Sequence, residues 1–186
     1  ERCIMSHVPP QPSTDRLTDF RVHPIVLVVD PEIPELLIVP AVSLATATGG
    51  AIHFAYVDPA RYVIEEFPDG HVRHAALSPD SLHSNWQELE SKFEAELGLT
   101  LGDLGSSEWH FHYLAGRPDR ALTHLARALD AATIVVGTRA PGTRAHIRQM
   151  LDGSVAYHLT QHQHRPVLSV PLSVVDWKAV ASVWDR

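Results

Sequence analysis

The sequence predicts an α/β protein with an open, mostly parallel five-stranded sheet and helices on both of its faces. Two observations carry this prediction. Five short apolar runs, rich in β-branched residues, alternate along the chain with four stretches of helical spacing. The runs are apolar without a break, which is typical of strands covered on both faces of a parallel sheet. Strands and helices in alternation favour βαβ units, and therefore a sheet between two layers of helices.

The first strand is expected in "PIVLVVD", residues 24–30, which ends in an acidic residue. Residues 31–50 follow with helical spacing, and Gly49 and Gly50 end that helix. Pro40 lies inside this stretch. Either the first turn of the helix is irregular, or the regular helix begins near Pro40, because proline is accepted at a first helical position.

The second strand is expected in "AIHFAYVD", residues 51–58. Residues 59–79 are interpreted as a loop with a turn at residues 68–70, Pro-Asp-Gly. An amphipathic helix is predicted within residues 78–98 because apolar side chains recur there at spacings of three and four. These side chains are Leu82, Trp86, Leu89, Phe93 and Leu97.

The second half of the chain repeats the pattern twice more. "SEWHFHYLAG", residues 107–116, predicts a third strand, and residues 117–131 predict a helix with a proline in its first turn. "ATIVVGT", residues 132–138, predicts a fourth strand. Helical spacing follows Gly153, and "RPVLSVP", residues 165–171, predicts the fifth strand.

The composition excludes several classes of protein. Of the 186 residues, 45% are hydrophobic and 20% charged, which is enough apolar material for one sizeable core. The net charge of -7 argues against a general nucleic-acid or anionic membrane surface. The single cysteine, Cys3, forms no intramolecular disulfide, and neither a secretory signal nor a membrane span of ~20 apolar residues is found. We expect a cytoplasmic protein with no nucleic-acid and no membrane partner.

Three segments are expected along the chain. Residues 1–22 are rich in Pro, Ser, Thr and Asp and predict a flexible arm. Residues 23–171 hold the α/β domain. Residues 172–186 are expected to form a short helix that covers one face of the domain or a partner subunit. That expectation rests on the helical spacing of Val174, Trp177, Val180, Ala181 and Trp184.

Candidate ligand residues stand at the carboxyl ends of the predicted strands. Asp30 ends the first run, Asp58 ends the second, and Gly137 lies near the end of the fourth. Open parallel sheets bind ligands beyond the carboxyl ends of their strands, where the strand order reverses. The sequence therefore predicts a binding site that brings these three residues to one edge.

Several of these stretches resemble universal stress protein domains. "LDAATIVVGTR" and "GSVAYHLTQHQHRPVLSVP" are similar to the C-terminal half of that family, and "AGRPDRALTHLARALDA" is similar to its third strand and next helix, with a Gly-x-Pro turn. "PIVLVVD" and "AIHFAYVDP" look like its first two strands. The resemblance covers residues 22–171. It implies a Rossmann-like five-stranded fold, and a homodimer that pairs through the last strand at residues 166–170.

The resemblance also implies ATP, with Mg²⁺, bound through the pattern G-x2-G-x9-G-[ST]. Gly137 matches the first glycine, and Gly153 with Ser154 matches the closing pair. Ala140 stands at the middle glycine, Gly142 follows it, and the loop is about three residues longer than the pattern. The candidate cofactor-binding residues are Asp30, Tyr56, Val57, Asp58, Gly137, Arg139, Gly142, Gly153, Ser154 and Val155.

The chemistry of these residues suits a nucleotide, with a structural alternative for each group. Gly137 would allow close approach of a phosphate, the start of the helix at Gly153 would offer free N–H groups, and Arg139, Arg144 and Arg148 would add charge. Asp30 would accept from ribose hydroxyls or help hold Mg²⁺, and residues 56–58 would border the adenine through backbone. Alternatively, the glycine forms a turn, the serine caps a helix, and the arginines form a solvated face.

The histidines and the motif search complete the interpretation. His158 and His162 share a helix face, and His110 and His112 share a strand face, without a matching cysteine or carboxylate pattern. We expect structural histidines and no metal, with a pH response as the alternative. No catalytic motif is found. The predicted function is a regulatory domain that senses or carries ATP as a homodimer. The alternatives are a dimeric stress or interaction protein without nucleotide, and a weak ATPase.

Overall fold

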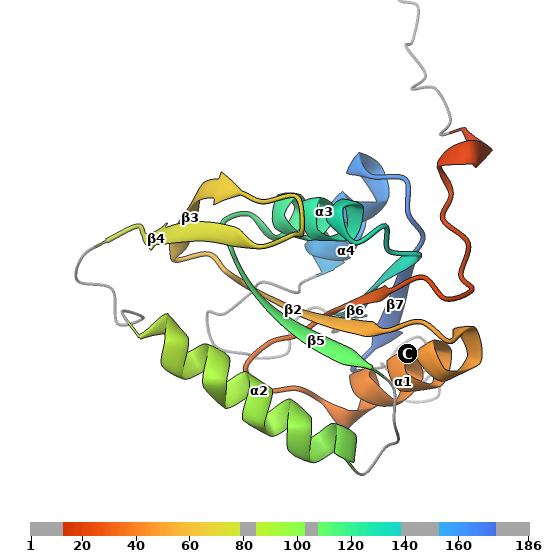
Figure 1. Ribbon diagram of the computed structural model, residues 1–186, viewed down its shortest axis with the longest axis horizontal. Helices are drawn as coiled ribbons and strands as arrows, with labels where there is room; N and C mark the ends of the chain where they lie inside the picture. The colour runs from red at the N-terminus through yellow and green to blue at the C-terminus, as the bar shows by residue number, and fades with distance from the viewer. Residues whose placement is uncertain (1–12, 79–84, 103–107, 139–152, 174–186) are drawn as a thin grey trace, which may run out of the picture.

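The protein folds around a five-stranded parallel sheet with the strand order β5-β2-β1-β6-β7 (Figure 1). The structure is a computed structural model and describes residues 13–78, 85–102, 108–138 and 153–173. The strands of this sheet are β1 (Ile25–Val28), β2 (Ile52–Asp58), β5 (Trp109–Ala115), β6 (Thr133–Thr138) and β7 (Val167–Pro171). The helices are α1 (Glu35–Thr48), α2 (Trp86–Gly102), α3 (Pro118–Ala128) and α4 (Gly153–His162), with a short 3-10 helix, η1 (Thr14–Arg16).

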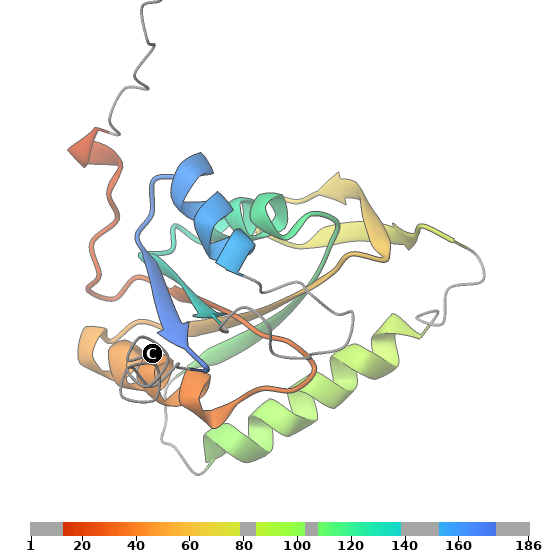
Figure 2. The same cartoon turned by 180° about the vertical axis from the view of Figure 1, so that it is seen from behind.

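Helices cover both faces of the sheet, as predicted. The helices α1 and α2 lie on one face, and α3 and α4 lie on the other, which the view from behind also shows (Figure 2). Strand β1 contributes side chains to the cores on both faces of the sheet because successive side chains along a strand point to opposite faces. Ile25, Leu27 and Val29 enter the core under α1 and α2, whereas Val26 and Val28 enter the core under α3 and α4. The unbroken apolar run of this strand is explained by burial on both sides.

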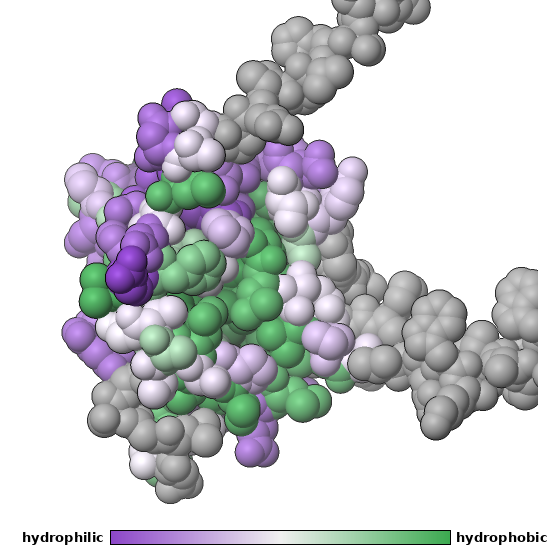
Figure 3. All heavy atoms as spheres, turned by 90° about the vertical axis from the view of Figure 1, so that its right-hand side faces the viewer, coloured by the Kyte–Doolittle hydropathy of each residue, from purple (hydrophilic) through white to green (hydrophobic). Residues whose placement is uncertain are grey.

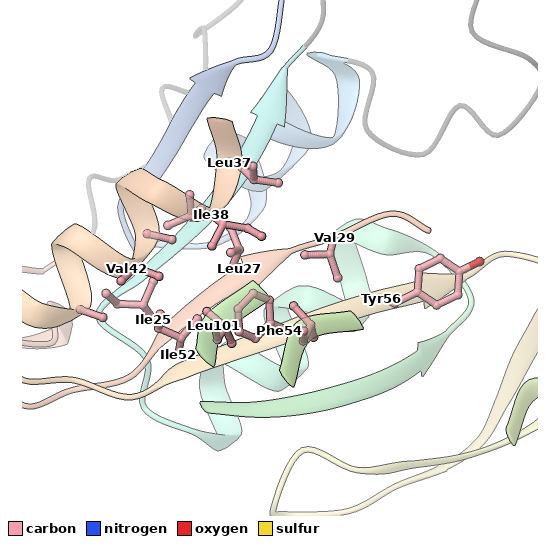
Figure 4. Close-up of a cluster of buried hydrophobic side chains, with 14 of the residues drawn as sticks. Ile25, Leu27, Val29, Leu37, Ile38, Val42, Ile52, Phe54, Tyr56 and Leu101 are labelled. Atoms are coloured by element: carbon pink, nitrogen blue, oxygen red, sulfur yellow. The ribbon is translucent and has the colours of Figure 1, made fainter. Parts of the chain in front are cut away.

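The core under α1 and α2 is the larger of the two clusters (Figure 4). Helix α1 begins at Glu35 and continues through Pro40, so the alternative of a helix that starts near Pro40 is wrong. Leu37 and Ile38, just before the proline, are almost fully buried against the sheet. Their burial holds the first turn in place although the proline removes one N–H donor from the helix.

Residues 59–79 were expected to be a loop, and this expectation is wrong. Strands β3 (Arg61–Glu66) and β4 (Val72–Ala76) form an antiparallel hairpin there, on the same side of the sheet as α3 (Figure 1). The predicted turn lies at the tip of this hairpin, where Gly70 adopts a φ of 90° and its N–H donates to Phe67 O. The alternation of buried and exposed side chains along the hairpin is weak because the register of its strands shifts between Val63 and Glu65.

Among the other boundaries, that of α2 differs most from the sequence prediction. Helix α2 begins at Trp86, later than expected, and buries Phe93, Leu97 and Leu101. Leu82 lies outside the described residues, as do most of the predicted arm and nearly all of the C-terminal extension. Helix α4 begins at Gly153, as predicted.

Candidate functional site at the carboxyl edge of the sheet

The order of the strands reverses between β1 and β6. The chain passes from β1 through α1 to β2 on one side, whereas β6, the other neighbour of β1, is entered from α3. The register pairs Val28 with Ala55 and Leu27 with Val135. The residues just beyond these pairs therefore lie side by side at the carboxyl edge, where such sheets bind ligands.

Asp30 lies at this edge, two residues beyond the end of β1. It is partly exposed, as is Thr138 at the end of the neighbouring strand β6. The sequence placed Asp30, Asp58 and Gly137 at strand ends, and the parallel pairing brings all three strand ends to one edge.

The end of β2 is more deeply buried than the end of β1. Tyr56 packs its ring against Phe93 and Tyr113, with centroid separations of 5.0 and 5.3 Å. Figure 4 shows its hydroxyl at the carboxyl end of the strand, pointing away from the aliphatic side chains. Val57 turns to the opposite face and lies in the core under α3 and α4. Both side chains are structural, so a ligand would meet this segment through its backbone.

The carboxylate of Asp58 accepts hydrogen bonds from groups within the protein. Only 1% of the residue is exposed. One oxygen accepts from Ala60 N–H at 2.8 Å, and the other accepts from the hydroxyl of Tyr113 at 2.6 Å. Burial and this hydrogen bond raise the pKa of Tyr113, so its hydroxyl stays protonated and remains a donor. Asp58 therefore joins β2 to β5 and leaves no carboxylate oxygen without a partner.

Gly137 has a packing reason to be glycine. A Cβ at this position would come within 2.6 Å of the Cδ1 of Leu172, which follows β7. The N–H of Leu172 donates to Thr138 O at 2.7 Å, so the two strand ends are tied together. The side chain of Leu172 therefore occupies the space above this glycine that a close ligand would need.

The start of α4 belongs to the same edge. Because β6 and β7 are parallel neighbours and α4 joins them, α4 runs back from the carboxyl edge and its N-terminus lies there. The first N–H groups of a helix have no partner within it and favour an anion. Val155 is buried in the core under α3 and α4, so only its backbone is available to a ligand. Arg139 and Gly142 lie outside the described residues, as do Arg144 and Arg148.

A cluster of histidine side chains lies away from this edge, where β2 and β5 begin. The register pairs His53 with His110, and the ring of His53 stacks on His110 and on His112 at 4.7 and 5.1 Å. The ring centroid of His71, in the hairpin, lies 5.6 Å from that of His112. The sequence revealed only the pair on β5, because the contribution of His53 depends on the pairing of two strands far apart in the chain.

The remaining observations concern metals and membranes. Within the described part of the chain, no three His, Cys, Asp or Glu residues are arranged to hold a metal ion. His158 and His162 are both exposed on α4, and Nδ1 of His162 lies 3.0 Å from the carbonyl oxygen of His158. Across the same described residues, no helix has the length and apolar character needed to cross a membrane.

The fold is a doubly wound α/β domain, and its strand order reverses between β1 and β6, which is where open sheets of this kind generally bind ligands. The sequence model of the universal stress protein family matches residues 22–171, and the chain belongs to that family. Gly116, with a φ of 87°, and Pro118, in the first turn of α3, form the Gly-x-Pro turn on which the resemblance partly rested. Comparison with curated proteins found no match.

Solved structures show the same fold. A universal stress protein from Archaeoglobus fulgidus superposes with a TM-score of 0.54 at 17% identity, covering 81% of this chain and 94% of that one. A structure described as that organism's universal stress protein in complex with dAMP gives 0.51 at 20% identity, covering 80% and 97%. The universal stress protein UspA from Lactobacillus plantarum gives 0.51 at 17% identity, covering 81% and 98%.

Proposed function

We propose that this chain is a universal-stress-type regulatory domain that senses or carries an adenine nucleotide, ATP with Mg²⁺, at the carboxyl edge of its sheet. The observation that carries the proposal is the convergence of Asp30, the end of β6 and the N-terminus of α4 on one edge. In this proposal a carboxylate at the edge would accept from ribose hydroxyls, and the helix terminus at the same edge would favour phosphate. The dAMP complex of the Archaeoglobus protein adds support from a protein of the same fold.

The residues present fit a nucleotide in part. Asp30 would serve the ribose or Mg²⁺, and residues 56–58 would border the adenine through backbone groups. Gly153 and Ser154 would offer N–H groups to the phosphates, and Arg139 and Gly142, which precede α4 in the sequence, would contribute as well. When bound, Mg²⁺ would neutralise charge on the phosphates.

One alternative function has its own support: the same fold acting as a dimeric stress or interaction protein without nucleotide. Leu172 fills the space above Gly137, and both carboxylate oxygens of Asp58 already accept hydrogen bonds. The sequence between Gly137 and Gly153 also departs from the family pattern. The weak ATPase alternative rests on the fold alone, and a fold does not define an activity.

We also propose a homodimer that pairs through β7. This strand is an edge of the main sheet, and 40% of Leu168 is exposed. Figure 3 looks at the side of the molecule that carries β7 and α1, where hydrophobic residues gather in the middle of the face. An exposed apolar edge strand favours pairing with another strand. A monomer by light scattering at micromolar concentration would contradict this proposal.

Calorimetric titration of ATP with Mg²⁺ into the dialysed chain tests the nucleotide proposal. The variant Gly153→Arg adds bulk at the start of α4. Its matched control is Gly98→Arg, because Gly98 is exposed on α2 with open space around its Cα. Saturable binding that Gly153→Arg removes and Gly98→Arg retains is the expected result. A folded wild type that binds no ATP up to millimolar concentration would instead favour the interaction protein.

A further inference from the structure

The hairpin of β3 and β4 is attached to the domain by packing contacts and not by strand pairing. Its two strands pair with each other in a separate two-stranded sheet and not with β5. Gly70 packs against Leu125 of α3, Val72 reaches the core under α3 and α4, and the ring of His74 lies 4.9 Å from that of Trp86. An element held without shared strand hydrogen bonds opens at a lower free energy than the central sheet does.

Two buried histidines lie beside the tip of this hairpin. His53 on β2 and His112 on β5 are only 8% and 6% exposed. Nδ1 of His53 and Nε2 of His112 are 2.8 Å apart, so one of these nitrogens donates a hydrogen bond to the other. The accepting nitrogen must lack a proton, whereas an imidazolium carries a proton on both nitrogens. The two rings therefore cannot both be cations in this arrangement.

The other nitrogen of His112 strengthens this restriction. Its Nδ1 is buried and has no hydrogen-bond partner among the described residues. A cationic His112 would turn this atom into a charged donor with no acceptor in the described part of the chain. Burial of an unpartnered charged donor is strongly unfavourable. The closed arrangement is therefore compatible with neutral rings and opposed to proton uptake.

The groups that face the pair come from every element around it. On β5, His110 stacks on His53, and Glu108, which precedes the strand, lies 3.2 Å from His110. On the hairpin, His71 faces His112, and Asp69 lies 3.3 Å from His71. Protons on the neighbouring imidazoles oppose a charge on the pair, while the carboxylates of Glu108 and Asp69, both exposed, attract it. The surrounding pockets are also lined by His74 on β4 and by Glu90 and Glu94 on α2.

We propose that the His53–His112 pair is an acid-sensitive latch: it keeps the β3–β4 hairpin closed over β5 while both rings are neutral, and proton uptake releases the hairpin. Release exposes His112 to water, which removes the penalty on its charge. It also uncovers the apolar contact between the hairpin and Leu125, so the acid form presents a surface that the neutral form hides. The latch is independent of the carboxyl edge and of any nucleotide.

The direction of the pH dependence follows from the pKa values. Burial and the charge of His110 lower the pKa of His53 to about 4, and burial and the charge of His53 lower that of His112 to about 3. In the open form, water-exposed imidazoles titrate near ~6.5. The open form therefore binds more protons below that pH, and the closed form is lost as pH falls. For each histidine, the equilibrium constant for hairpin opening rises by up to about tenfold per unit fall in pH. This rise stops at the pH where the closed form itself takes up the proton.

Hydrogen exchange of the full chain between pH 7 and pH 4.5, corrected for the intrinsic pH dependence of exchange, tests the latch. The test variant is His53→Leu with His112→Leu, which removes the pair and leaves no unpaired partner. The matched control is His158→Leu with His162→Leu, because these histidines are both exposed on α4. In the wild type and the control, protection of the β3 and β4 amides should fall by about tenfold or more per pH unit below ~6.5. In the test variant it should stay nearly constant, and β1 and β6 should stay protected in all three proteins.

Three outcomes would overturn the proposal: hairpin protection that does not change with pH, an equal loss in the test variant, or loss of β1 and β6 protection in step with the hairpin. The third outcome would indicate global acid unfolding. If the test variant fails to fold, NMR titration of the wild-type histidines decides. Midpoints well below 6.5 for His53 and His112 support the latch, and midpoints at or above it refute it.

Discussion

The carboxyl edge and the hairpin region differ in the kind of polar group that they contain. At the edge, the proposed ligand groups are the Asp30 carboxylate and backbone atoms at the end of β6 and the start of α4. At the hairpin, the buried polar groups are side chains, above all His53 and His112. Backbone groups do not titrate, whereas imidazoles that become exposed to water take up protons near pH ~6.5. We therefore expect the edge to respond to an anionic ligand and the hairpin to respond to pH.

The largest expected effect lies where the two regions meet, at Tyr113. The substitution Tyr113→Phe removes the donor to a buried oxygen of Asp58. A hydrogen bond to a buried charge contributes about 1.5–3 kcal/mol, so the free energy of unfolding at pH 7 should fall by roughly that amount. Urea unfolding measures this change. Tyr157→Phe is the control because Tyr157 is 62% exposed on α4, and its effect should stay within about 0.5 kcal/mol. Equal stabilities of the two variants would show that Asp58 does not need this donor.

The next effect tests how the hairpin is attached. Gly70→Ala places a Cβ at a φ of 90° and within 2.7 Å of Leu125 Cδ1. Strain and overpacking together should destabilise the closed hairpin by about 2 kcal/mol. Hydrogen exchange at pH 7 should show a larger loss of amide protection in β3 and β4 than in β1. Gly98→Ala, on the exposed face of α2, should be neutral or slightly stabilising. Equal loss of protection in β1 and the hairpin would mean that the two regions open together.

The smallest effect belongs to the edge. Gly137→Ala brings a Cβ against the flexible end of Leu172, which can shift, so we expect a loss of about 1 kcal/mol in the free energy of unfolding. The same change in a Leu172→Ala background should be less destabilising because the contact is gone. Thermal and urea unfolding of the four proteins in this cycle measure the coupling. A coupling of zero would show that Leu172 does not explain the glycine.

The sequence predicted the parts of the fold that burial defines. The run around Ile25–Val28 is covered on both faces, so its apolar pattern is unambiguous. The hairpin was missed because Tyr62 and Ile64 are exposed and its register shifts, which leaves a short pattern that resembles a loop. Asp58 was placed correctly at a strand end, but the use of its carboxylate depends on Tyr113, which is 55 residues away in sequence. Contacts of that kind depend on register, which no local pattern contains.

The position of Leu172 links the binding edge to the path of the chain. Its N–H is held by Thr138 O, and its side chain lies over Gly137, so the first residues after β7 are anchored at the end of β6. A molecule that took the space over Gly137 would have to lift this anchor. Occupancy of the space over Gly137 would therefore be coupled to the position of Leu172, and through its N–H to the end of β6.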